Sequence, residues 1–99
     1  MKFETKNYDT ALIGCGYWGT NIAKALVRIK KNKIFIFDQN RSNSLILQKR
    51  FNKKLILAPN LNYILHNKEI KNIILATPPA NNYSLLKNCI KNNKHIFIE

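Results

Sequence analysis

Residues 10–19 read TALIGCGYWG, and this stretch gives the clearest structural signal in the chain. A short apolar run, residues 10–13, stops abruptly at a glycine, as a buried strand does where it meets a turn. The residues after it fit G-x-G-x-x-G, and Gly14, Gly16 and Gly19 are the only glycines in the chain. In a dinucleotide-binding turn they allow a tight turn, a close approach of the backbone to a pyrophosphate, and close packing of helix on strand. We therefore expect a strand, a turn and a helix whose N-terminus faces phosphate groups.

Short apolar runs and helical patterns alternate along the rest of the chain. Ile22, Leu26 and Ile29 lie on one face of a predicted helix from Tyr17 to about residue 30. Further strands are predicted at Ile34–Phe37, Leu55–Leu57, Ile73–Ala76 and His95–Ile98. Three further helices are expected: one capped by Ser42 or Ser44, one capped by Asn60, and one over residues 81–91 that buries Leu85, Leu86, Cys89 and Ile90.

This alternation of strands and helices predicts an α/β fold. We expect a Rossmann-like, doubly wound parallel sheet of about five strands, with helices on both faces. The dinucleotide-binding domain would cover residues 9–99, and residues 1–8 would form a polar leader.

Asp38 stands at the end of the second predicted strand, 19 residues after Gly19. The adenosine ribose of a bound dinucleotide lies at this place, and a carboxylate there accepts hydrogen bonds from the ribose hydroxyls. Because the same carboxylate repels a 2′-phosphate, we expect NAD as the cofactor. Arg41, three residues further on, leaves NADP as the alternative.

The chain is strongly basic, with 17 Lys and Arg against five Asp and Glu and a net charge of +12. Such an excess nominally indicates nucleic-acid binding. Here 15 Asn, 14 Lys and 14 Ile accumulate together, and all three have A/T-rich codons. The lysines are also dispersed, and the densest patch, KRFNKK at residues 49–54, is short. Nucleic-acid binding is therefore the weaker hypothesis.

Composition also excludes other classes of protein. The strongest apolar runs are four residues long, whereas a membrane-spanning helix needs about 18. The N-terminus lacks the apolar segment of a signal peptide. Cys15 and Cys89 form neither a CxxC pair nor a metal-binding spacing, so no disulfide scaffold and no metal site is expected. These features favour the cytoplasm.

Three motifs resemble those of one known family. Residues 12–21 (LIGCGYWGTN), 76–79 (ATPP) and 94–99 (KHIFIE) resemble the glycine motif, the A-T-P-P element and the G-K-H-V-x-x-E-K-P run of the Gfo/Idh/MocA oxidoreductases, in the same order. Glucose–fructose oxidoreductase and inositol 2-dehydrogenase belong to this family. The G-Y-W-G-x-N form further resembles members that act on nucleotide-linked sugars.

The resemblance implies a set of cofactor-binding residues. Those around the pyrophosphate are Gly14, Gly16, Tyr17, Trp18 and Gly19, and Asp38 holds the ribose. Those at the nicotinamide end are Thr77, Pro78, Pro79, Asn82 and Glu99. Asn82 stands where members commonly carry His, and Asn93 replaces the usual Gly before Lys94.

Family members use a lysine in proton transfer that would follow Glu99 directly, and they bind substrate in a further α/β domain. Neither is in the sequence, so we expect no catalytic residue within residues 1–99 and a domain truncated before its sixth strand. The resemblance implies the NAD(P)-binding domain of a sugar or nucleotide-sugar dehydrogenase, inactive by itself. A standalone dinucleotide-binding module is the alternative, and an exposed apolar strand at residues 95–98 would favour a homo-oligomer.

Overall fold

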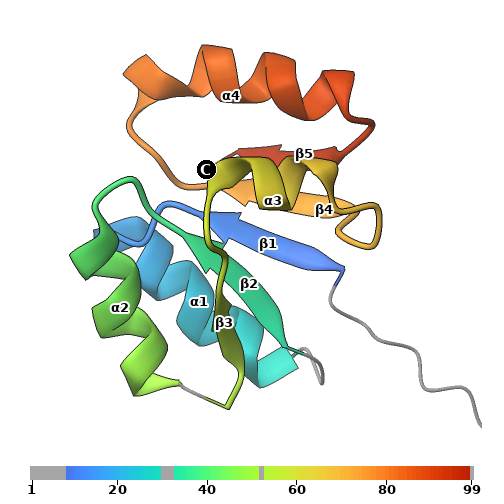
Figure 1. Ribbon diagram of the computed structural model, residues 1–99. Helices are drawn as coiled ribbons and strands as arrows, with labels where there is room; N and C mark the ends of the chain where they lie inside the picture. The colour runs from blue at the N-terminus through green and yellow to red at the C-terminus, as the bar shows by residue number, and fades with distance from the viewer. Residues whose placement is uncertain (1–8, 30–32, 52, 99) are drawn as a thin grey trace, which may run out of the picture.

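The computed structural model describes residues 9–29, 33–51 and 53–98, so the polar leader and Glu99 lie outside the described residues. Strands and helices alternate in this part of the chain (Figure 1). The strands are β1 (Thr10–Ile13), β2 (Ile34–Phe37), β3 (Leu55–Leu57), β4 (Asn72–Leu75) and β5 (His95–Ile98). The helices are α1 (Tyr17–Ile29), α2 (Arg41–Arg50), α3 (Leu61–His66) and α4 (Pro79–Lys91). The predicted α/β alternation is confirmed.

The described strands form one sheet in the order β3-β2-β1-β4-β5, and every neighbouring pair is parallel. The chain builds outward from β1 to β3 and then crosses over through α3 to β4, on the other side of β1. The strand order thus reverses between β1 and β4. In open parallel sheets this reversal leaves a crevice at the carboxyl ends of the two strands, where ligands bind.

Two apolar clusters hold helices on the two faces of the sheet. One cluster joins Ala11 and Ile73 of the sheet to Ile64 of α3 and Cys89 of α4. The other joins Leu12 and Ile36 to Ala23 of α1 and Leu47 of α2. Because successive residues of a strand point to opposite faces, β1 contributes to both clusters and is buried throughout. The doubly wound arrangement is therefore confirmed (Figure 1).

Several local predictions were wrong. The N-cap of α2 is Asn40, whose side chain accepts a hydrogen bond from the Ser42 amide, so neither Ser42 nor Ser44 caps this helix. The last helix begins at Pro79 rather than at residue 81, since proline suits the first turn of a helix. Strand β4 ends at Leu75, one residue before the predicted Ala76.

Ile29, which was predicted to lie on the apolar face of the first helix, and Ile90, which was predicted to be buried, are both exposed. Ile29 is the last residue of α1, beyond the stretch of that helix that contacts the core. In α4, Leu85 and Cys89 pack into the core cluster, whereas Ile90 points away from it. A residue next to Cys89 is turned by about 100° around the helix axis, which places Ile90 on the solvent side.

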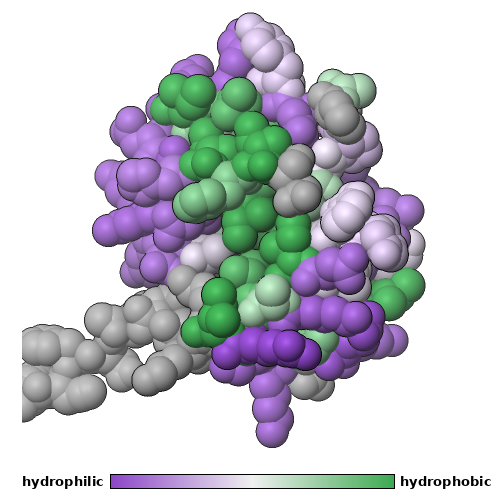
Figure 2. Space-filling model, turned by 180° about the vertical axis from the view of Figure 1, so that it is seen from behind, coloured by the Kyte–Doolittle hydropathy of each residue, from purple (hydrophilic) through white to green (hydrophobic). Residues whose placement is uncertain are grey.

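Strand β5 forms one edge of the described sheet, and its side chains are largely exposed: Phe97 is 61% and Ile98 is 51% exposed. Phe97 is the register partner of Ile74, a residue packed against the α1–α2 cluster. Viewed from behind, the molecule shows a continuous apolar band flanked by hydrophilic side chains (Figure 2). Apolar surface is thus left uncovered by the described residues.

Candidate functional site

The turn after β1 is possible only with glycine at Gly14. This residue has φ +109°, a region that L-residues with side chains rarely adopt. A Cβ built on it would lie 2.6 Å from the carbonyl oxygen of Ala76, at the end of β4. The Gly14 amide also donates a 2.8 Å hydrogen bond to the carbonyl of Phe37, at the end of β2. The turn is therefore pressed between the ends of both strands that flank β1.

Gly19 and Gly16 serve opposite purposes in the same turn. A Cβ on Gly19 would lie 1.8 Å from the Gly14 carbonyl oxygen, so the first turn of α1 packs directly on the backbone of the glycine turn. A Cβ on Gly16 would meet no atom within 4 Å. The fold itself thus requires glycine at position 19, whereas at position 16 the backbone faces open space. A side chain at position 16 would therefore collide only with a bound ligand, not with the protein itself.

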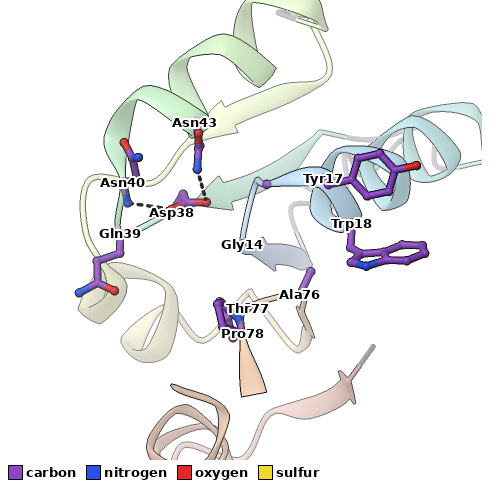
Figure 3. A pocket seen from close by; sticks show the side chains of 11 residues that line it. Gly14, Tyr17, Trp18, Asp38, Gln39, Asn40, Asn43, Ala76, Thr77 and Pro78 are labelled. Atoms are coloured by element: carbon purple, nitrogen blue, oxygen red, sulfur yellow. Dashed lines mark hydrogen bonds between the residues drawn. The ribbon is translucent and has the colours of Figure 1, made fainter. Parts of the chain in front are cut away.

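That open space is a cavity of about 860 Å³ at the carboxyl ends of the strands (Figure 3). Its lining residues come from the glycine turn with the start of α1, from the segment that leads into α2, and from the segment after β4. They are Gly14, Gly16, Tyr17, Trp18, Asp38, Gln39, Asn40, Asn43, Ala76, Thr77 and Pro78. The volume lies in the range of about 300–1,000 Å³ that is usual for small-molecule and cofactor sites.

The carboxylate of Asp38 is fixed at one end of this cavity by backbone amides. Its Oδ2 accepts a 2.7 Å hydrogen bond from the Cys15 amide and a longer one, 3.4 Å, from the Asn43 side chain. Its Oδ1 accepts a 2.7 Å hydrogen bond from the Asn40 amide. A carboxylate has about four acceptor positions, so acceptor capacity is left for a ligand. Asp38 therefore joins the glycine turn to the start of α2 (Figure 3).

The N-terminus of α1 opens on the middle of the cavity. Its first-turn amides lack acceptors within the helix, and the helix dipole adds partial positive charge there. The first turn contains no acidic residue that would neutralise this charge. Together with the bare backbone at Gly16, this arrangement is suited to an anionic group such as a phosphate.

Comparison with known proteins identifies the family. A family model described as "Oxidoreductase family, NAD-binding Rossmann fold", that of Gfo/Idh/MocA, matches residues 8–99. The chain belongs to this family. It is therefore an NAD-binding Rossmann domain of oxidoreductase type, as the three sequence motifs indicated.

Several solved structures share this fold. A protein from Desulfitobacterium hafniense, assigned as an NADPH-dependent oxidoreductase, has a TM-score of 0.80 at 19% identity, over 96% of this chain and 27% of its own. GenD2 from gentamicin A biosynthesis, in complex with NAD, has a TM-score of 0.75 at 20% identity, over 90% of this chain and 25% of its own. Levoglucosan dehydrogenase, in complex with NADH and L-sorbose, has a TM-score of 0.72 at 20% identity, over 93% of this chain and 26% of its own.

The chain thus spans about a quarter of the length of these proteins. No curated protein matches it. Within the described residues, no helix is both long enough and apolar enough to cross a membrane.

Tyr17 and Trp18 of this Rossmann domain are not core residues. Their side chains are 77% and 58% exposed, and the rings contact each other edge to face with centroids 5.4 Å apart. Both residues line the cavity, at the end opposite Asp38 (Figure 3). Each of these exposed rings has an apolar face on which a ligand could pack.

The residues predicted after β4 do not all line the cavity. Thr77 and Pro78 line the cavity, and the Thr77 hydroxyl donates a hydrogen bond to the side-chain oxygen of Asn82. Asn82 is not among the lining residues, so its contact is with Thr77. Pro79 begins α4, but its side chain, like Glu99, lies outside what the structure describes.

Sequence reasoning missed four lining residues, namely Gln39, Asn40, Asn43 and Ala76. The three polar residues lie within five positions after Asp38. The sequence signal that could have found them is the pair of asparagines: Asn40 caps the next helix, and the Asn43 side chain donates to the Asp38 carboxylate.

The remaining conspicuous residues have no reactive role at this site. Cys15 is buried, and burial, followed by the nearby negative charge of Asp38, raises the pKa of its thiol to about 12, although a hydrogen bond to the Phe37 carbonyl opposes the rise. A thiol of this kind is protonated at neutral pH and is a poor nucleophile. His66 and His95 line another cavity. No group of metal-ligating side chains occurs among the described residues.

Proposed function

We propose that the cavity holds NAD(H) in one orientation. The pyrophosphate would lie against Gly16 and the N-terminus of α1, and the adenosine ribose would bind Asp38. The nicotinamide end would extend toward Trp18, Thr77 and Pro78. The observation that carries this proposal is the hydrogen bond between the Cys15 amide and the Asp38 carboxylate, 2.7 Å long, because it holds a ribose acceptor beside the phosphate-binding turn.

The residues present fit a dinucleotide. Gly16 leaves a space that a side chain would fill, and no packing within the described protein accounts for it. The cavity is lined on three sides by short polar side chains, the bare glycine turn and exposed aromatic rings, which suit a ribose, a pyrophosphate and a planar ring respectively.

The position of Asp38 favours NAD over NADP. Its carboxylate accepts hydrogen bonds from ribose hydroxyls but repels a 2′-phosphate, and two unit charges about 4 Å apart near a protein surface interact by about 4 kcal/mol before salt screening. Arg41, the residue that kept NADP as an alternative, is exposed and does not line the cavity. None of the lining residues is a cation.

We also infer that the substrate of the complete protein is a sugar or a nucleotide-linked sugar. Bound nicotinamide supplies hydride transfer. This chain's residues would bind and orient the cofactor: Thr77, whose hydroxyl donates to Asn82, and the rings of Tyr17 and Trp18 would flank the nicotinamide end. The sugar class is supported by the levoglucosan dehydrogenase that shares this fold. This chain matches about a quarter of that enzyme. The sugar class is therefore proposed for the complete protein.

A standalone, non-enzymatic dinucleotide-binding module is the second candidate. Among the lining residues, only Asp38 and Tyr17 have titratable side chains, and neither Lys nor His is present. The described cavity therefore lacks the lysine that the family resemblance implies for proton transfer. Turnover would require groups supplied from outside the described residues, whereas binding would not.

Calorimetric titration with NAD and NADP tests the cofactor assignment. We expect tighter binding of NAD by the parent chain and about ten- to a hundredfold weaker NAD binding by Asp38→Ala, because a hydrogen bond to a charged group contributes roughly 1.5–3 kcal/mol. Asp38→Asn keeps an oxygen for the Cys15 amide and separates the loss of charge from the loss of the turn. Glu69→Gln, a change of the same charge at an exposed loop residue, should leave both affinities unchanged. Equal affinity of the parent for the two cofactors would contradict the assignment of Asp38.

A further inference from the structure

A second cavity lies at the amino ends of β4 and β5, at the opposite end of the strands from the dinucleotide cavity. It has a volume of about 570 Å³ and is formed by the end of α3, the end of α4 and the loops that lead into β4 and β5. The two loops lie side by side (Figure 1), and the His95 amide donates a 2.8 Å hydrogen bond to the Lys71 carbonyl. The cavity is thus built from two segments, within residues 65–71 and 91–95, that are 20 or more positions apart in sequence.

The lining of this cavity is basic. It includes Lys68, Lys71, Lys91, Lys94, His66 and His95, and none of its lining residues is acidic. Lys91 lies in the last turn of α4, where a cation is stabilised by the helix dipole. Lys68 and Lys71 lie in the loop after α3 and are exposed. Helix-dipole stabilisation thus accounts for Lys91, whereas Lys68 and Lys71 add positive charge to the same cavity from a separate segment.

Lys94 gives the cavity a fixed cation. Its ammonium group donates hydrogen bonds to the carbonyls of Asn67, at 2.8 Å, and Ile70, at 2.5 Å. An ammonium group has three donors, so one is left for a further acceptor. Burial lowers the pKa of Lys94, which shows that its charge is partly removed from water. An anion that entered the cavity would replace part of that lost solvation.

We propose that this basic cavity binds a small anion that carries two or more phosphate groups, such as pyrophosphate or a nucleoside polyphosphate. Four ammonium groups from separate segments match the charge and the several oxygens of linked phosphates. The volume of about 570 Å³ lies in the range of small-molecule sites. A nucleic acid fits less well, because single strands are bound along extended grooves with aromatic rings for the bases, and this lining has no Phe, Tyr or Trp.

The two histidines of the chain make this site directly observable. His66 and His95 are the only histidines, and both line the basic cavity. We expect pyrophosphate to shift their ring proton resonances in a saturable way at constant ionic strength. The titration should use the Gly16→Val variant, in which the dinucleotide cavity is blocked, so that this result is independent of NAD binding. Absence of any saturable shift of either histidine would overturn the proposal.

Two double variants that each remove two positive charges distinguish binding in this cavity from a general effect of the net charge. Lys68→Gln with Lys71→Gln should weaken pyrophosphate binding about 25-fold, taking about fivefold for each unit charge pair near 4 Å in water. Lys24→Gln with Lys87→Gln removes the same charge from residues outside the cavity and should change binding less than twofold. Equal losses in the two double variants would overturn the proposal. So would a single-stranded oligonucleotide that binds more tightly than pyrophosphate, with an affinity that rises with its length.

Discussion

Replacing Gly16 with valine should abolish cofactor binding without unfolding the protein. A Cβ at this position meets no protein atom within 4 Å, and Gly16 has no positive φ that would exclude a side chain. The added branches would therefore occupy only the space proposed for the pyrophosphate. If two hydrogen bonds from the turn to charged phosphate oxygens are lost, the cost is about 3–6 kcal/mol, or roughly 10²- to 10⁴-fold in affinity.

The assay combines calorimetric titration of NAD with thermal unfolding of the same samples. Gly16→Ala serves as the graded variant, with a smaller loss of affinity and a stability equal to that of the parent or higher by about 0.4–1 kcal/mol, since alanine restricts the unfolded chain. Circular dichroism of both variants should match that of the parent. A Gly16→Val protein that binds NAD normally would refute the placement of the pyrophosphate. A variant that unfolds would refute the claim that this position faces open space.

Other measurements follow from the same geometry. Gly19→Ala should be strongly destabilising, because its Cβ would collide with the Gly14 carbonyl oxygen; a variant with normal thermal stability would contradict this packing. Above pH 9.0, the thiol of Cys15 ionises in the unfolded chain but stays protonated in the fold up to pH about 12, so its contribution to the free energy of unfolding should fall with rising pH. At pH 10.5 the loss should be about 2 kcal/mol relative to Cys15→Ala in urea denaturation, and identical pH profiles would argue against a protonated thiol. The polypeptide of residues 1–99, produced alone, should show no NADH formation with NAD and a panel of sugars and nucleotide sugars. It should also self-associate through β5 in sedimentation, more strongly at high salt because of its net charge of +12, and Phe97→Lys should reduce this.

The strands and the glycine turn were predictable because local sequence dictates them. Residues 10–13 and 34–37 are buried on both faces of a parallel sheet, so they appear as uninterrupted apolar runs. Gly14 and Gly19 are required by contacts that any Rossmann turn makes, and the motif records those contacts.

Other features depended on which of several suitable residues the tertiary structure selects. Asn40, Ser42 and Ser44 are all good caps, and Asn40 caps the helix in the structure, where Asp38 also binds its amide. Trp18 could equally have packed in the core, whereas in the structure its side chain is 58% exposed. Asn82 was assigned to the cofactor from a sequence pattern, yet its contact is with Thr77, which no single sequence reveals.

The close approach of Gly14 to Ala76 has a consequence for folding. These residues are 62 positions apart, so the floor of the cavity forms only after a long loop has closed and β4 has paired with β1. A fragment that ends before β4 would contain the whole glycine motif and Asp38 but no complete binding site. During synthesis the cofactor would find its site only after residues up to Pro78 had emerged and docked. From then on NAD would stabilise the entire sheet by mass action, by about 2.7 kcal/mol at a hundred times its dissociation constant.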